Sequence, residues 1–131
     1  MATTGRPAGE TSARYGPDEG KPVPVVDFNV THVTRPIEVI HHPAERFYEL
    51  LDAGTSLALL VYEKNSHQTA ITHAMVREDR RGNGLGSTLI ASALDDLATS
   101  GAKVTNYCAS VANFLDKHPE YKRLVEVGAK G

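Results

Sequence analysis

Three observations predict that the sequence folds as a single α/β (α+β) domain with a mixed, mainly antiparallel sheet. Short segments rich in β-branched and apolar residues fill the first half of the chain. An apolar stripe at helical spacing follows, formed by Leu89, Ile90, Ala93, Leu94 and Leu97. A further extended segment lies beyond this helix. A strand–helix–strand unit of this kind places its two strands parallel.

Length and composition restrict the class of protein. The 131 residues are enough for one domain with a core. A net charge of −2 gives neither a nucleic-acid footprint nor a surface for anionic membranes. The chain has no apolar run of membrane-spanning length and no apolar core of a secretory signal. Its single cysteine, Cys108, fits a reducing compartment, so we expect a cytoplasmic protein.

The N-terminal segment differs in composition from the rest of the chain. Residues 1–27 are rich in Gly, Pro, Thr, Ser and charge, and their apolar residues cluster only from Val23 onwards. Such a composition predicts a disordered tail. The folded domain is therefore expected over residues 28–131.

The sheet is expected to begin with a meander of antiparallel strands. Asp52-Ala53-Gly54 is a turn signal between two apolar segments, and Lys64-Asn65-Ser66-His67 is a second polar turn. The four strands are predicted at Ile37–His41, Arg46–Leu51, Ser56–Glu63 and Gln68–Val76. By itself, Arg46–Leu51 is compatible with a short helix or a strand, and the turn signal after it favours a hairpin.

The second half is predicted to alternate helix and strand. A helix after the fourth strand runs from about Leu85 to Ser100 and ends at Gly101, a natural C′ glycine. A fifth strand over Lys103–Cys108 is followed by a second helix over Ser110–Lys117, which Pro119 stops. Arg123–Val127 is expected to add a short final strand or a helical turn.

The turn before the first helix has the composition of an anion site. Its glycines allow a tight bend, and the first N–H groups of a helix lack internal acceptors and carry partial positive charge. Such a turn holds an anion, most often a phosphate. The Walker loop is excluded because no lysine follows Gly86, and Gly82-Asn83-Gly84-Leu85-Gly86 is one residue too tight for the dinucleotide fingerprint.

Arg81-Gly82-Asn83-Gly84-Leu85-Gly86 resembles the R/Q-x-x-G-x-G/A pyrophosphate loop of the GNAT superfamily of acetyl-CoA-dependent N-acetyltransferases. The hairpin meander, the strand ending in cysteine and His118-Pro119-Glu120-Tyr121 extend this resemblance to the compact, single-domain YjdJ-type branch. The resemblance implies acetyl-CoA (coenzyme A) as cofactor. It also implies that the backbone of Met75 and Val76 pairs with the pantetheine arm. The pyrophosphate would be held by Arg81, Gly82, Asn83, Gly84, Leu85, Gly86 and Ser87.

Cys108 is the first candidate catalytic residue. It is predicted at the C-terminal end of the fifth strand, the edge where open α/β sheets place their ligands. In the branch that the chain resembles, a cysteine at this place is proposed to act near the acetyl group. It could carry the acetyl group covalently or protonate the leaving thiolate. The alternative is that the thiol fills space in the core.

His73 is the second candidate, as a general base on an alternating strand, where it faces away from Ala70 and Ala74. The alternative is a structural, hydrogen-bonded histidine. Many relatives carry Thr-Glu after this histidine, whereas this chain has Ala74-Met75. A glutamate that could serve as base is therefore missing.

No metal site is predicted. His41, His42 and His67 lack ligand spacing and are interpreted as solvated turn residues. His118-Pro119-Glu120-Tyr121 is interpreted as a helix stop with Tyr121 packed on the core.

The predicted function is transfer of an acetyl group from acetyl-CoA to a primary amine of a protein or small molecule. The alternative is an acyl-CoA-binding module of the same fold with little or no catalysis. No nucleic-acid or membrane partner is expected, and the chain is expected to be a monomer or a weak homodimer.

Overall fold

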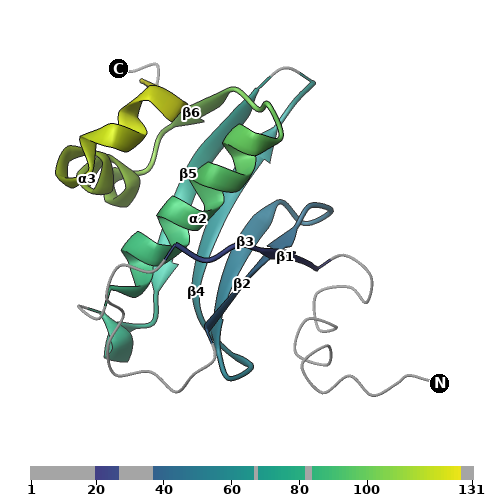
Figure 1. Ribbon diagram of the computed structural model, residues 1–131, viewed down its shortest axis with the longest axis vertical. Helices are drawn as coiled ribbons and strands as arrows, with labels where there is room; N and C mark the ends of the chain where they lie inside the picture. The colour runs from purple at the N-terminus through teal and green to yellow at the C-terminus, as the bar shows by residue number, and fades with distance from the viewer. Residues whose placement is uncertain (1–19, 27–36, 67, 82–83, 128–131) are drawn as a thin grey trace.

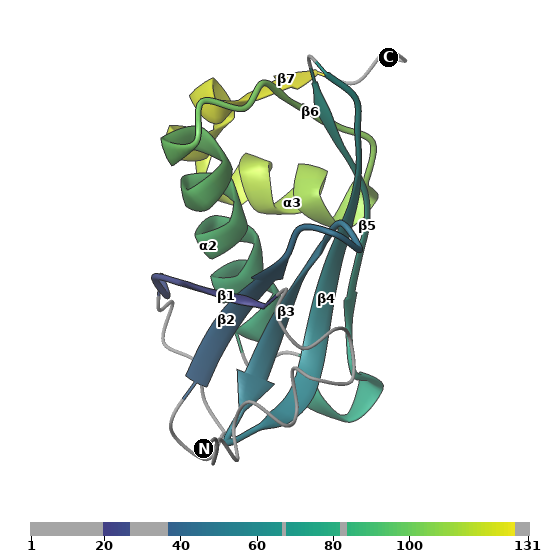
Figure 2. The same ribbon diagram turned by 90° about the vertical axis from the view of Figure 1, so that its right-hand side faces the viewer.

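A computed structural model describes residues 20–26, 37–66, 68–81 and 84–127. Within these ranges the chain forms one seven-stranded sheet whose strands lie side by side in sequence order. Both long helices cover the same face of this sheet (Figures 1 and 2). The mixed α/β architecture is the one that the sequence predicts.

The meander and the crossover are confirmed. The strands are β1 (Lys21–Val23), β2 (Ile37–His42), β3 (Phe47–Asp52), β4 (Thr55–Lys64), β5 (Thr69–Val76), β6 (Val104–Asn106) and β7 (Val125–Val127). The helical segments are η1 (Glu78–Arg80), α2 (Leu85–Thr99), α3 (Ala109–Lys117) and η2 (Pro119–Leu124). Neighbouring strands are antiparallel from β1 to β5, whereas β6 runs parallel to β5 and β7 parallel to β6.

Strand β1 lies inside the segment that was expected to be a disordered tail. Lys21 pairs with His41 of β2, and the side chain of Val23 is buried in the core. Beyond β1, the backbone N–H of Val26 donates to Ser92 Oγ on α2 at 2.9 Å. The folded chain therefore begins before residue 27, and the long helix follows the fifth strand of the sheet instead of the fourth. Residues 1–19 lie outside the described ranges.

Helix α2 forms the centre of the core. All five residues of the predicted apolar stripe are buried, and Leu94 is 0% exposed. They pack against the apolar residues of β3 and β4, including Leu50 and Leu60. The helix ends as predicted, because Gly101 adopts φ +82°, a left-handed conformation that favours glycine.

Strand β5 pairs fully on one side and only briefly on the other. Its pairing with β4 runs from Thr69 to Val76, but its pairing with β6 stops at Ile71, opposite Asn106. The chain after β6 then turns away into α3. The two parallel strands therefore separate halfway along β5 and leave one edge of its second half open.

A β-bulge in β5 changes which side chains face the helices. Tyr62 of β4 pairs with Ile71, while Val61, the residue before Tyr62, pairs with His73. Thr72 is the extra residue, and Ile71 before it and Ala74 after it both pack on the core side. The simple alternation predicted for this strand is therefore interrupted.

The interpretation of His41 and His42 as solvated turn residues is wrong. Both lie in β2, and the side chain of His42 is 0% exposed, with Nε2 2.9 Å from Glu49 Oε1. His41 stacks on Tyr48 and lies 2.7 Å from the Tyr62 hydroxyl through Nε2. His67 lies outside the described residues.

Candidate functional site

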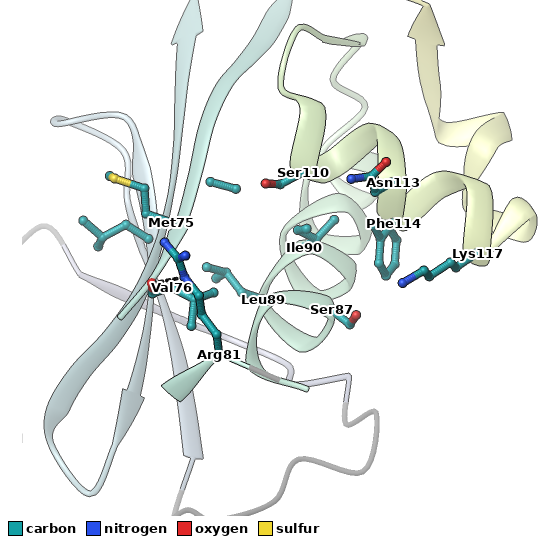
Figure 3. Close-up of a pocket in the computed structure, with 13 residues that line it drawn as sticks. Met75, Val76, Arg81, Ser87, Leu89, Ile90, Ser110, Asn113, Phe114 and Lys117 are labelled. Atoms are coloured by element: carbon teal, nitrogen blue, oxygen red, sulfur yellow. Dashed lines mark hydrogen bonds between the residues drawn. The ribbon is translucent and has the colours of Figure 1, made fainter. Parts of the chain in front are cut away.

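A cavity of about 480 Å³ opens between β5, the first turn of α2 and one face of α3. It lies where β5 and β6 have separated, on the helix-covered face of the sheet (Figure 3). Its lining comprises Leu59, Ala74, Met75, Val76, Arg81, Gly86, Ser87, Leu89, Ile90, Ser110, Asn113, Phe114 and Lys117.

One wall of the cavity is the open edge of β5. The N–H of Arg77 donates to the Leu57 carbonyl of β4 at 2.9 Å. Because backbone groups alternate between the two edges of a strand, the N–H and C=O groups of Val76 and Ala74 point toward the open edge. There the Val76 carbonyl accepts a long contact from Arg81 Nε at 3.4 Å. This edge can therefore pair with an extended ligand.

The N-terminus of α2 forms the second wall. Gly84 is its N-cap and adopts φ +84°, a left-handed conformation in which a side chain would be strained. The first intrahelical bond runs from the N–H of Thr88 to the Gly84 carbonyl at 3.1 Å. The N–H groups of the three residues before Thr88 therefore have no acceptor inside the helix. Gly86 and Ser87 of this turn line the cavity.

Helix α3 forms the third wall of the cavity and presents a stripe of polar side chains there. Ser110, Asn113 and Lys117 all line the cavity, and Figure 3 shows them in this order along the helix. Their spacings of three and four residues put them on one helical face. The uncharged Ser110 lies toward β5, and the cationic Lys117 lies at the far end of the stripe.

Among the described residues, the lining of the cavity carries positive charge and no negative charge. It includes Arg81 and Lys117 but neither aspartate nor glutamate. Arg81 and Lys117 make no ion pair with any described carboxylate, whereas nearby Arg77 pairs with Asp79 at 2.8 Å and Lys122 with Asp116 at 3.9 Å. In a protein with a net charge of −2, this charge distribution favours an anionic ligand.

The predicted cofactor-binding residues are only partly brought together. Met75, Val76, Arg81, Gly86 and Ser87 line the cavity. Gly84 caps the adjoining helix, whereas the side chain of Leu85 points into the core and is 1% exposed. Gly82 and Asn83 lie outside the described residues.

Cys108 lies close to the cavity without lining it. It is the N-cap of α3 and is 8% exposed within the core. Asn106 fixes its backbone, because Asn106 Oδ1 accepts from the Cys108 N–H at 2.9 Å and Nδ2 donates to the Cys108 carbonyl at 3.0 Å. Ser110, two residues further on, reaches the cavity instead.

His73 does not line the cavity either. Its side chain is exposed, and Nδ1 lies 3.0 Å from Thr72 Oγ1. The bulge at Thr72 places His73 on the opposite face from Ala74 and Ile71, both of which pack toward the core. Within the described chain, His73 is hydrogen-bonded to Thr72 and Cys108 to Asn106, and no hydrogen bond joins His73 to Cys108.

Sequence reasoning missed the polar stripe of α3. Val111 and Phe114 mark the apolar face of this helix, and both are buried. Ser110, Asn113 and Lys117 form a second stripe at helical spacing beside it. The signal was present in the sequence, but only the parallel crossover turns this stripe toward β5.

Comparison with models of protein families identifies the family of this chain. The model of the GCN5-related N-acetyl-transferase family matches residues 46–124, which extend from just before β3 to the end of η2. The chain belongs to the GCN5-related N-acetyltransferase family. The match includes every residue that lines the cavity. Assignment to the YjdJ-type branch within the GNAT superfamily stays a prediction.

A solved structure shows distant similarity to this GCN5-related protein. It is the ribosomal-protein-alanine N-acetyltransferase from Brucella melitensis biovar Abortus 2308, at 16% sequence identity and a TM-score of 0.46. The similarity covers 63% of this chain and 62% of that chain, which is less than two thirds of either. No curated protein matches the sequence significantly.

The described ranges contain neither a metal-ligand cluster nor a helix fit to cross a membrane. No group of three or more His, Cys, Asp or Glu residues there could hold a metal ion. No helix there combines the length and apolar character that a membrane crossing requires.

Proposed function

We propose that this GCN5-related protein transfers the acetyl group of acetyl-CoA to a primary amine of a protein or small molecule. The observation that carries the proposal is the cavity itself. It combines an open strand edge, a helix N-terminus and two cations that pair with no described carboxylate. Coenzyme A has matching parts, namely an extended amide-containing arm and a pyrophosphate.

The polarity of the cavity orients this ligand. The pyrophosphate would lie on the first turn of α2, where free N–H groups and Arg81 favour an anion. The pantetheine arm would extend along β5 and pair with the open backbone groups of Val76 and Ala74. The alternation of β5 favours Ala74 over Met75 as the partner of Val76, because the backbone of Met75 points toward β4. The thioester would then lie near Ser110.

Acetyl transfer needs a neutral amine, a donor for the oxyanion and a proton for the leaving thiolate. The amine attacks the thioester carbonyl, the C–S bond breaks, and the amine loses one proton while the thiolate gains one. Ser110 is the hydroxyl at the β5 end of the cavity, so we propose that it protonates the thiolate. Free N–H groups in the first turn of α3 favour negative charge at this place.

The roles predicted for Cys108 and His73 stay proposals that variants can separate. If Cys108 carries the acetyl group, rapid quench of the reaction yields an acetylated Cys108 peptide, and Cys108→Ala abolishes turnover. If Ser110 is the proton donor, Ser110→Ala lowers kcat by about 100-fold and Cys108→Ala retains turnover. His73→Gln tests the general base in the same assay, through loss of turnover.

Binding of acetyl-CoA is the first experiment, by calorimetry on the wild type, Ser87→Glu and Ser87→Gln. A carboxylate in the first turn of α2 interacts favourably with the helix dipole, so Ser87→Glu is expected to fold. It places negative charge where the pyrophosphate would lie, and binding should fall by at least 100-fold. Ser87→Gln, of equal size but uncharged, should lose much less. Absence of binding to the wild type would contradict the proposed function.

A second candidate function is an acyl-CoA-binding module with little or no catalysis. The supporting observation is that no described His, Asp or Glu lines the cavity, where a general base would be expected. Release of free CoA thiol on a broad amine panel distinguishes the two. Turnover supports the enzyme, whereas tight binding without turnover supports the module.

A further inference from the structure

The cavity beside β5 also extends around the open edge of this strand. Two of its lining residues, Leu59 of β4 and Met75 of β5, pair with each other. Leu60 and Ala74, their neighbours in sequence, pack toward the helices. Because side chains alternate along a strand, Leu59 and Met75 lie on the outer face, the face of the sheet opposite α2 and α3. Figure 3 shows Met75 on that side of β5, so a ligand at this edge is accessible from the outer face.

A second hollow, of about 260 Å³, lies further along the same strands. Its floor is Ala70 of β5, which pairs with Glu63 of β4 and with Thr105 of β6. Paired residues share a face of the sheet, and the next residue, Ile71, packs in the core. The hollow therefore lies on the outer face. Tyr107, two residues after Thr105, also lines it.

Hydrogen bonds hold the rim of this outer hollow in place. Asn65 Oδ1 accepts from the N–H of Gln68 at 2.8 Å, which closes the turn between β4 and β5. Gln68 Nε2 donates to Thr105 Oγ1 at 2.6 Å and so connects this turn to β6. The N–H of Tyr107 donates to the Ile71 carbonyl at 2.9 Å, at the point where β5 and β6 separate.

Two side chains make the outer hollow suited to a cation. Glu63 is exposed, and it pairs with no described cation. Lys64 also lines the hollow but pairs with Thr69, on the helix side of the sheet. There, burial lowers the pKa of His41, and the nearby ammonium group of Lys64 adds to this shift. Tyr107 is 54% exposed, and the face of an aromatic ring attracts an ammonium group.

The outer hollow lies within reach of the position proposed for the thioester. Ala74 and Ala70 pair with residues of β4 that are three positions apart, which corresponds to about 10 Å along the strand. The pantetheine arm would pair with β5 as far as Ala74, so a group in the hollow would lie at most about 10 Å from the reacting carbonyl. Val61 and His73 pair with each other between these two points.

We propose that the acceptor is a linear diamine, of which one amine reacts at the open edge of β5 and the other binds in the outer hollow. The bound group is an ammonium ion that contacts the carboxylate of Glu63 and the ring of Tyr107. This inference rests on the proposed function and names its substrate class.

Only one of the two amines changes in the reaction. It loses a proton to solvent and attacks the thioester carbonyl, and the C–S bond then breaks. The new amide nitrogen loses its second proton, and the leaving thiolate gains one. The other amine keeps its proton and its positive charge beside Glu63.

The test compares kcat/KM, counted per amine, for 1,6-diaminohexane and hexylamine. The proteins are the wild type, Glu63→Gln, Tyr107→Leu and Tyr107→Phe. Glu45→Gln is the matched control, because Glu45 is an exposed carboxylate outside the lining of the outer hollow. The readout is the ratio of the two values within one preparation, which cancels any difference in the folded fraction. A second pair, 1,3-diaminopropane and propylamine, has a chain too short to span about 10 Å.

We expect the wild type and Glu45→Gln to prefer 1,6-diaminohexane by about tenfold, from one ion pair and one cation–π contact. Glu63→Gln and Tyr107→Leu should each reduce this preference to about threefold, and Tyr107→Phe should retain it. The value for hexylamine should be the same in all five proteins. The shorter pair should show no preference.

Equal values for 1,6-diaminohexane and hexylamine in the wild type would overturn the inference and leave the proposed function standing. So would an equal loss for both compounds in Glu63→Gln, since Glu63 would then not act on the second amine. An equally strong preference for 1,3-diaminopropane would also overturn it. Absence of acetylation of every amine would overturn the inference together with the proposed function.

Discussion

Two polar regions of the molecule differ in whether their groups already have partners. The first region lies beside the last turn of α2. There the Tyr48 hydroxyl donates a hydrogen bond to Asp96 Oδ2 at 2.7 Å, and His41 is hydrogen-bonded to the Tyr62 hydroxyl. At the other, the cavity beside β5, Arg81 and Lys117 have no carboxylate partner in the described chain. Burial of polar groups is stable when they satisfy one another. The first region therefore stabilises the fold, whereas the second has the unpaired cations that the proposed ligand site requires.

Breaking the first region should have the largest effect on stability. Asp96→Ala removes the carboxylate that accepts the hydrogen bond of the Tyr48 hydroxyl, and Tyr48 is 0% exposed. The same carboxylate lies 3.7 Å from His41. We expect a loss of about 3 kcal/mol in the free energy of unfolding, measured by denaturant titration. Acetyl-CoA affinity of the folded protein should not change.

Asp95→Ala is the control for that change, because Asp95 is the neighbouring, exposed position on α2. Its effect should stay within about 0.5 kcal/mol. Equal losses in the two variants would contradict a specific role for the Tyr48–Asp96 bond.

Removing the cavity cations should show the opposite pattern. The double variant Arg81→Gln/Lys117→Gln should lose about 100-fold in acetyl-CoA affinity, from two charge-assisted contacts of about tenfold each. Its free energy of unfolding should change by less than about 0.5 kcal/mol, since neither side chain has an ion pair to lose. The control Arg77→Gln/Lys122→Gln removes two paired cations outside the cavity lining and should retain binding.

Acid should weaken the first region through His41. Burial lowers the pKa of His41 below its ordinary value of 6.5, and the nearby Asp96 opposes this shift. Below pH 6.5 the unfolded chain binds this proton before the folded chain does, so stability falls as the pH falls, until the folded pKa is passed. Denaturant titrations from pH 7.5 to about pH 5 should show a shallower slope for His41→Gln.

The smallest effect is expected at Gly86. An added Cβ would lie 3.4 Å from Val76 Cγ2, an ordinary contact, and this glycine is helical. Gly86→Ala should therefore keep stability or raise it by up to about 1 kcal/mol. The methyl group narrows the cavity, so acetyl-CoA affinity should fall by a few fold, measured by calorimetry. Unchanged affinity would place the ligand away from this wall.

Most of the fold could be predicted because its strands and helices carry strong local patterns. The stripe from Leu89 to Leu97 and the turn at Asp52-Ala53-Gly54 each define an element without help from the rest of the chain. Strand β1 was missed because it has three residues and is held by pairing with β2. The bulge at Thr72 was missed because threonine favours regular strands equally well.

The candidate site was predictable in part for the same reason. The glycine-rich turn is contiguous, so Arg81 and Ser87 could be assigned to one cavity from sequence. Lys117 belongs to the same cavity only through the crossover that brings α3 against β5. The exposure of His73 depends on the bulge, and local sequence carries no signal for it.

The contrast between the cationic cavity and the net negative charge of the chain also governs how an anion would reach the protein. At physiological ionic strength, charges beyond about 8 Å are largely screened, and the chain as a whole has a net charge of −2. A polyanion at long range therefore meets no attraction and is drawn in only at the mouth of the cavity. Added salt should then shorten the lifetime of the complex far more than it slows its formation.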